Sequence, residues 1–490
     1  MDDLLLEYST PEIQKRNLTP ITSTKSRQVT RNSNRSRLFS PCTTATPKYT
    51  ERKSRGEVLF SFGFASSSKD APWDCFSKKF VDKKFEIKFS DFNNVLKSPY
   101  NYMYQVPYDI MMTLSNNLDL LAQIYMDSIE DEDFEWSRVD AVQNDEPIHV
   151  YGMITCPNEF NRLELSSVML QGSWANSAGN SIPLDMSSIP SFSIFPGQFI
   201  ALQGVNPSGK QFIAQKILPL PLPLPQSPQT CVEFSLMCAA GPFTTNDNLD
   251  FQPLQDLIDM VAEKRPDFLI LIGPFVPVKH PLIEKNLVSF AHDKIFDVLI
   301  NRYVIEPLKE IPTKVVLISS SKDIFHQPIY PTPPHFCRKF DVEKVTVLSD
   351  PSVIELNGIS FGLTSTDILF HLSKEEISNA DGNRMTRLLN HLMTQRRFYP
   401  LYPPNEDLNV DFVQADAYCS FDRLPLVLIT PSNLRQFSQE VNSVCCLNPG
   451  YLCKSESGGT YARLKINTKC VNFSNKCQIS DYIGAEIVRV

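Results

Sequence analysis

The stretch that decides the fold is Phe268–Ile272, read as FLILI and followed at once by Gly273 and Pro274. An uninterrupted apolar run of this length, closed by turn residues, is typical of a strand buried on both faces. Similar runs predict strands at 232–239 and 315–318, with helical periodicity between them. Strand and helix in alternation predict one sizeable α/β domain over 230–490, with helices covering both faces of the sheet. After about Lys344 the runs shorten, which favours mixed or antiparallel pairing there.

A run of alternating prolines precedes this domain. Residues 219–225 read PLPLPLP, and Pro228 follows. Alternate prolines hold polyproline geometry, so we predict a semi-rigid linker over 219–229. Upstream, residues 141–218 contain about five short strand-like runs separated by Gly, Asn and Pro, which favours a small barrel of the OB type. Residues 195–197 are expected to form the turn that feeds a strand beginning at Gln198.

The first 140 residues have a different character. Residues 1–56 are poor in apolar side chains and rich in Ser, Thr, Lys and Arg, so we predict a disordered regulatory tail. Four Ser/Thr-Pro pairs make regulated phosphorylation an expectation at Thr10, Thr19, Ser40 and Thr46. Residues 57–140 are predicted to form a partly helical linking segment, because apolar residues recur at threes and fours between 110 and 124.

Charge and composition narrow the classes of function. The formal net charge is −8 and the pI is about 5.5, which argues against a protein that mainly grips a phosphate backbone. Within 141–218 three basic residues face five acidic ones, so this barrel is expected to bind protein, with DNA contact weak or indirect. No apolar stretch approaches the roughly 18 residues of a membrane helix. The twelve cysteines include no C-x-x-C pair, which favours reduced core cysteines.

One motif invites a nucleotide-binding interpretation. Residues 204–210 (GVNPSGK) match the first seven positions of a P-loop, but Gln211 stands where Ser or Thr must follow. The next residues resemble a strand, whereas a P-loop needs a helix there. The segment is therefore predicted to be a β-hairpin turn, and no nucleotide site is expected.

The loops after the predicted strands resemble those of calcineurin-like metallophosphoesterases with the ligands removed. Active members hold two metals with Asp and His at strand ends, in motifs such as D-x-H and G-N-H-[DE]. The corresponding positions in this chain are Ala239, Gly241, Pro274, Ser321, Lys322 and Asp323. Of these only Asp323 could ligate a metal, and with His326 it is more typical of a loop contact than of a site. We therefore expect neither metal nor cofactor, and no enzymatic activity.

A longer string of segments resembles the B-subunit family of eukaryotic DNA polymerase alpha. These segments are 240–245, 265–267 with 272–275, 326–331, 361–367, 399–404, 446–450 and 458–463, with 55–58 and 195–198 upstream. The resemblance implies a non-catalytic scaffold in the nucleus that binds the C-terminal domain of the catalytic polymerase chain and, through the complex, the primase subunits. Family members usually begin with a small helical domain, whereas this sequence is expected to start almost directly in the tail.

Three alternatives stay open from the sequence. The chain could be the B subunit of polymerase delta or epsilon, an active metallophosphoesterase, or a single-strand-binding protein. The Tyr-Pro segment at 399–404 also has two interpretations, because it could be an exposed rigid contact for a partner or a buried loop that only packs.

Overall fold

The computed structural model describes residues 48–52, 54–63, 87–89, 96, 101–157, 163–225, 228, 232–287, 292–335, 344–468 and 478–490. The four predicted phosphorylation sites, Thr10, Thr19, Ser40 and Thr46, lie outside the described residues. Most of the predicted tail lies outside them too. The chain from Pro47 onward forms one compact unit, and its two domains are described in turn.

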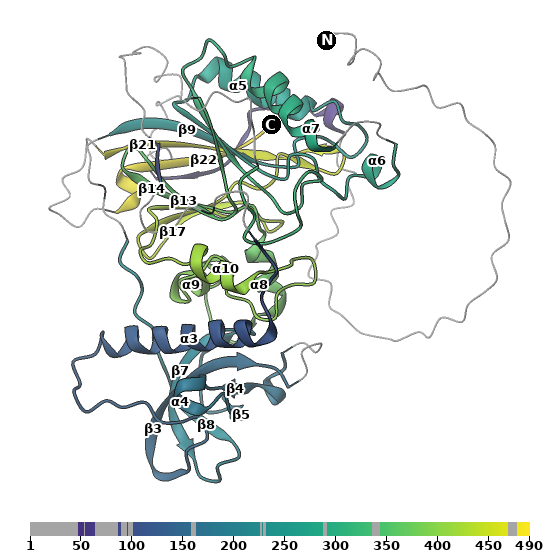
Figure 1. Ribbon diagram of the computed structural model, residues 1–490. Coiled ribbons are helices and arrows are strands. Elements are labelled where there is room, and N and C mark those ends of the chain that lie inside the picture. Colours follow the sequence, from purple (N-terminus) through teal and green to yellow (C-terminus); the bar gives the residue numbers. More distant parts are fainter. Residues whose placement is uncertain are drawn as a thin grey trace. The chain divides into compact units, whose positions relative to one another are not determined.

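Five strands close into a barrel, in the order β3-β4-β5-β8-β7 (Figure 1). Apolar side chains alternate along these strands and fill the interior, among them Val150, Leu170, Leu202 and Phe212, all fully buried. The predicted OB-type barrel is confirmed. The strands are β3 (Gln143–Thr155), β4 (Met169–Gln171), β5 (Ser181–Asp185), β7 (Phe199–Asn206) and β8 (Phe212–Leu218).

The hairpin between β7 and β8 contains the motif that imitates a P-loop. The two strands pair antiparallel, with Val205 opposite Ile213, and Gly209 has a φ of +70° in the turn between them. A strand, not a helix, follows Lys210, so no helix N-terminus faces the loop. The predicted hairpin turn is confirmed.

A long helix, α3 (Pro107–Met126), lies along one side of the barrel (Figure 1). Its buried residues Leu118, Leu121 and Tyr125 belong to one apolar cluster with Tyr151 and Phe199 of the barrel. The Tyr151 hydroxyl donates a 2.7 Å hydrogen bond to Asp119. The short helix α4 (Trp174–Ser177) follows β4 and is capped by the side chain of Ser173. The apolar periodicity between residues 110 and 124, which predicted a helix, therefore marks the face of α3 that packs on the barrel.

The second domain contains two stacked sheets of seven and six strands. The seven-stranded sheet has the order β1 (Val58–Phe62), β22 (Ile483–Arg489), β21 (Thr460–Asn467), β9 (Glu233–Ala240), β10 (Phe268–Ile272), β11 (Lys314–Ile318) and β12 (Val345–Leu348). The six-stranded sheet has the order β17 (Phe437–Val441), β18 (Val444–Asn448), β16 (Val427–Ile429), β14 (Ile359–Leu363), β13 (Ser352–Leu356) and β2 (Ile87–Phe89). Strands β9, β10 and β11 run parallel, as the buried apolar runs predicted, and β12 also pairs parallel with β11.

The inner faces of both sheets share one apolar core, which includes Ile270, Val316, Phe361 and Leu447. Helices cover the two outer faces (Figure 1). On the seven-stranded sheet these are α5 (Gln252–Lys264) and α7 (His292–Ile300), the latter continued by a π-helical turn over Asn301–Ile305. On the six-stranded sheet they are α8 (Ile368–Glu375), α9 (Arg384–Thr394) and α10 (Phe412–Tyr418). The domain is therefore a four-layer α/β sandwich, which agrees with the predicted fold class. The prediction of helices on both faces of one sheet is wrong, because the inner face of each sheet is covered by the other sheet.

Three segments differ from their predicted roles. Strands β1 and β2, expected in a linking segment, are edge strands of the two sheets of the sandwich. Tyr49, assigned to the disordered tail, is only 4% exposed and donates a 2.6 Å hydrogen bond to Asp256 on α5. The proline-rich linker is extended but not free, because Leu224 O accepts from Leu424 N at 3.3 Å. Each difference depends on a partner far away in the sequence.

Candidate functional site: the strand-end loops and the barrel junction

The loops that would hold metal in a phosphoesterase meet at one edge of the seven-stranded sheet, because β9, β10 and β11 are parallel neighbours. Backbone hydrogen bonds join them directly. Gly241 N donates to Ile272 O at 2.8 Å, and Gly273 N donates to Ile318 O at 2.9 Å. The carbonyl of Lys322 accepts from Val278 N at 2.9 Å. The strand-end loops are therefore fastened to one another by main-chain contacts.

Two glycines show how tightly these loops are packed. A Cβ atom built on Gly241 would lie 1.8 Å from the carbonyl oxygen of Pro274, and one on Gly273 would lie 2.7 Å from Cβ of Ser320. No side chain fits at either position unless the backbone moves. Gly241 is one of the degenerate phosphoesterase positions, so the space that a ligand's side chain would need is occupied by the neighbouring loop.

The other degenerate positions differ in how far they are buried. Ala239 is fully buried in the cluster that packs against α5 and α7. Lys322 is exposed, and Ser321 is partly buried beside it. Among the described residues, no group of three or more His, Cys, Asp and Glu side chains is placed to hold a metal ion.

Asp323 is the one predicted position with a carboxylate, and it is 2% exposed. Its Oδ1 accepts a 2.7 Å hydrogen bond from Val276 N, so it staples the second loop to the third. Its Oδ2 is buried without a hydrogen-bond partner in the described part of the chain. Burial raises the pKa of Asp323 well above its ordinary value, and the backbone hydrogen bonds from Val276 and Phe275 offset only part of this. The group therefore acts as a loop staple.

His326 contacts Asp323 through the backbone, where His326 N donates to Asp323 O at 3.1 Å. Its ring packs near that of His335, with centroids 6.1 Å apart. Burial, with a smaller contribution from His335, lowers the pKa of His326 to about 4, so the imidazole is neutral at pH 7. The hydrogen bond between these two residues is thus a backbone contact, and His326 Nε2 is buried without a hydrogen-bond partner in the described part of the chain.

A second buried carboxylate, which sequence reasoning missed, organises the loop after β14. Asp350 is fully buried and accepts hydrogen bonds from the Thr364 hydroxyl at 2.7 Å, from Ser365 N at 2.8 Å and from the Ser365 and Thr366 hydroxyls at 2.6 and 2.8 Å. All four carboxylate sites are filled. The sequence marks this loop only through the segment 361–367, which resembles the B-subunit family.

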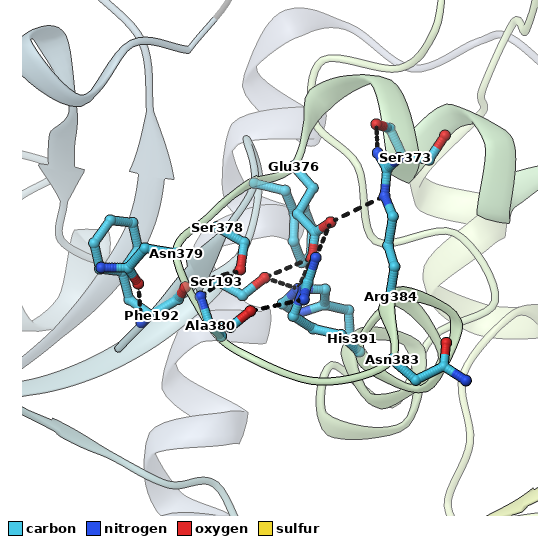
Figure 2. A network of polar contacts seen from close by, with 12 residues as sticks. Phe192, Ser193, Ser373, Glu376, Ser378, Asn379, Ala380, Asn383, Arg384 and His391 are labelled. Atoms are coloured by element: carbon cyan, nitrogen blue, oxygen red, sulfur yellow. Dashed lines mark hydrogen bonds and ion pairs between the residues drawn. The ribbon is translucent and has the colours of Figure 1, made fainter. Parts of the chain in front are cut away.

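The barrel meets the sandwich through a network of polar contacts centred on Glu376 (Figure 2). The Glu376 side chain is 2% exposed, and its Oε1 accepts from Arg387 Nε at 2.6 Å and from the Ser193 hydroxyl of the barrel at 2.7 Å. His391 Nε2 lies 2.7 Å from the same hydroxyl and 3.6 Å from Glu376 Oε1. Because the Ser193 hydroxyl donates its proton to Glu376, His391 is the donor to Ser193.

Uncharged groups make further contacts between the barrel and the sandwich. Gln395 at the C-terminal end of α9 bonds the backbone of Phe199, and Tyr402 N donates to Pro196 O at 3.1 Å. Gly197 approaches so closely that a Cβ there would lie 2.4 Å from Tyr402 N. Tyr399 and Leu401 are 7% and 2% exposed. Of the two interpretations of the Tyr-Pro segment, the buried packing role is the one that this geometry supports.

Comparisons with known proteins agree with this architecture. Residues 236–439 match the family of B subunits of DNA polymerases alpha and epsilon, and residues 111–220 match the OB domain of the DNA polymerase alpha B subunit. The DNA polymerase alpha B subunit of Rattus norvegicus is 34% identical over 505 residues, which cover 100% of this chain and 82% of the rat protein. That of Schizosaccharomyces pombe is 32% identical over 400 residues, covering 75% and 68%.

Among solved structures, an archaeal phosphodiesterase matches 52% of this chain and 99% of the archaeal chain, at 9% sequence identity and a TM-score of 0.24. The family matches place the chain in a class of B subunits that includes those of polymerases alpha and epsilon. Within this class, the chain belongs to the family of DNA polymerase alpha B subunits. The resemblance drawn from the sequence is confirmed.

Proposed function

We propose that the protein is the non-catalytic accessory subunit of a nuclear DNA polymerase alpha–primase complex. In this role it binds the C-terminal domain of the catalytic chain, reaches the primase subunits through the complex and supports primer synthesis when replication begins. The observation that carries the proposal is full-length similarity to curated alpha B subunits, 34% over the whole chain.

The closed strand-end loops support a role without catalysis. Two-metal hydrolysis needs several carboxylates and imidazoles around two ions about 3.5–4 Å apart. Here Gly241 has no room for a side chain, Lys322 carries a positive charge and Asp323 is used as a staple. The sandwich would thus act as a rigid surface to which a partner protein binds.

Exposed apolar side chains support a role in protein binding. Four lie within six residues where the chain enters α3, namely Met103, Tyr104, Val106 and Tyr108, which are 51% to 81% exposed. Gln105 holds this segment to the sandwich, because it donates to Val410 O at 2.9 Å and accepts from Phe412 N at 2.7 Å. Large apolar side chains exposed together often mark interaction surfaces. The net charge of −8 favours a protein partner over bare nucleic acid. In the described part of the chain, no helix is both long and apolar enough to cross a membrane.

Metal binding and hydrolysis together test the non-catalytic part of this proposal. Purified chain is titrated with Mn²⁺ by calorimetry and assayed with a chromogenic phosphodiester, with a metallophosphoesterase as the positive control. The proposal predicts no stoichiometric binding and no turnover above buffer. Two bound metals with hydrolysis would identify the alternative, an active enzyme. Retention on single-stranded DNA at moderate salt would instead identify a DNA-binding protein.

A further inference from the structure

The barrel and the sandwich share a small piece of sheet. Strand β6 (Ser193–Ile194), next to the barrel, pairs antiparallel with β15 (Ile377–Ser378) of the sandwich. Asn379 extends this contact, because its Oδ1 accepts from Phe192 N at 2.8 Å and its N donates to Phe192 O at 3.2 Å. Glu376 immediately precedes β15, so its side chain lies where the two domains join (Figure 2).

The charges of this junction all come from the sandwich. Glu376 follows α8, and the cations Arg384 and Arg387 lie on α9. The barrel contributes a neutral hydroxyl, that of Ser193, and backbone groups of Phe192. A carboxylate that is 2% exposed has to be hydrogen-bonded throughout to be tolerated. One of the bonds that satisfies Glu376 exists only while the barrel is in place.

Ser193 joins two side chains of the sandwich in a single chain of bonds. It donates to Glu376 Oε1 and accepts from His391, whose ring also packs edge-on against Phe195 with centroids 4.8 Å apart. When the barrel moves away, Glu376 and His391 both lose this hydroxyl and have to be satisfied by water. The same movement opens the β6–β15 pairing.

We propose that Glu376, Arg387, His391 and Ser193 form an interdomain latch, which fixes the barrel on the sandwich and makes the two domains unfold as one cooperative unit. The contact between Gln395 and Phe199 holds the same junction one turn of α9 beyond His391 but carries no charge. The latch therefore sets the orientation in which the barrel and the sandwich present a joint surface to a partner.

A double-mutant cycle with hydrogen–deuterium exchange tests the latch in the full chain. The variants are Ser193→Ala, Glu376→Ala and both together, and peptides from β6, β15, β8 and β10 are followed. Glu375→Ala is the matched control, because Glu375 has no hydrogen bond or ion pair in the described part of the chain. Each single variant is expected to speed exchange in β6 and β15 on the order of tenfold or more, which is the worth of a hydrogen bond to a charged group.

The cycle distinguishes a latch from ordinary stabilisation. The proposal predicts that the double variant exchanges little faster than Glu376→Ala alone, and that β8 of the barrel opens at lower denaturant than β10 of the sandwich in these variants. Additive effects, or equal acceleration in all four strands, would overturn it. So would exchange in β6 and β15 that matches the Glu375→Ala control. If Glu376→Ala does not fold, Ser193→Ala alone keeps the test, because it removes only one hydroxyl group.

Discussion

The side-chain amide of Gln395 makes two hydrogen bonds with the backbone of Phe199, accepting from its N–H at 2.8 Å and donating to its carbonyl at 3.1 Å. Gln395 lies at the end of α9 in the sandwich, and Phe199 begins strand β7 of the barrel. The amide thus takes the place of a neighbouring strand for one residue of the barrel. Both groups are buried, so water cannot replace these bonds without structural change.

Gln395→Ala is expected to destabilise the protein by about 1–3 kcal/mol, because it leaves a buried N–H and a buried carbonyl without partners. The measurement is the free energy of unfolding in urea. Gln123→Ala on the exposed side of α3 is the control, and its change should stay within about 0.5 kcal/mol. Equal effects of the two substitutions would contradict the role assigned to Gln395.

The stability that Glu376 contributes should depend on pH in the acid range. Burial alone would raise the pKa of Glu376, but hydrogen bonds from His391, Arg387 and Ser193 and the charge of Arg387 outweigh it and lower the pKa from its ordinary 4.5 to about 2. Because the folded-state pKa is the lower one, the contribution is complete above pH 4.5 and is lost as the pH falls towards 2.

The corresponding measurement compares wild type with Glu376→Gln in urea at several pH values between about 7 and about 2.5. The gap in unfolding free energy should be about 3 kcal/mol at most near neutral pH and should shrink steadily below about pH 4.5. A gap that stays constant over the whole range would show that the charge of Glu376 contributes nothing.

The contribution of Asp323 to stability should change with pH in the opposite direction. Burial raises its folded-state pKa well above the ordinary 3.8, so the folded protein binds this proton more tightly than the unfolded chain. Wild type therefore loses stability relative to Asp323→Asn as the pH rises from about 4, by up to about 1.4 kcal/mol per pH unit until the folded-state pKa is reached. Unfolding free energies at four pH values from about 4 to about 7 check this. A difference between wild type and Asp323→Asn that stays the same at all four pH values would refute the buried-acid account.

Gly241→Ala tests the closure of the strand-end loops. Its new methyl group would lie 1.8 Å from the carbonyl oxygen of Pro274, so one loop has to move, at a cost of about 1–3 kcal/mol or more. The melting temperature should fall by several degrees. Gly458→Ala is the control, because the nearest atoms there are ring carbons of Tyr49 at 3.3 Å. A Gly241→Ala variant as stable as wild type would show that a side chain can be accommodated at this position.

The sequence predicted those strands and turns that are determined by residues close together in the chain. The buried run Phe268–Ile272 became the central parallel strand, and the segment 204–210 became a hairpin turn because the residues after it alternate as a strand does. These features need only neighbouring residues to be recognised.

What the sequence could not predict depends on distant partners. Strand β1 pairs with β22, which lies near the other end of the chain, and Tyr49 is buried by its contact with Asp256. Glu376 and Ser193 are likewise brought together only when the barrel meets the sandwich. Neither residue belongs to a motif, so nothing near them in the sequence marks the contact.

The central claim, a scaffold for the polymerase alpha catalytic chain, is tested most directly by co-purification. The full chain is co-expressed with the tagged C-terminal domain of a polymerase alpha catalytic chain or, in parallel, with its delta counterpart, and each eluate is sized by light scattering. The account predicts a stable one-to-one complex with the alpha domain and none with the delta domain. Binding to neither domain, or to the delta domain instead, would contradict it.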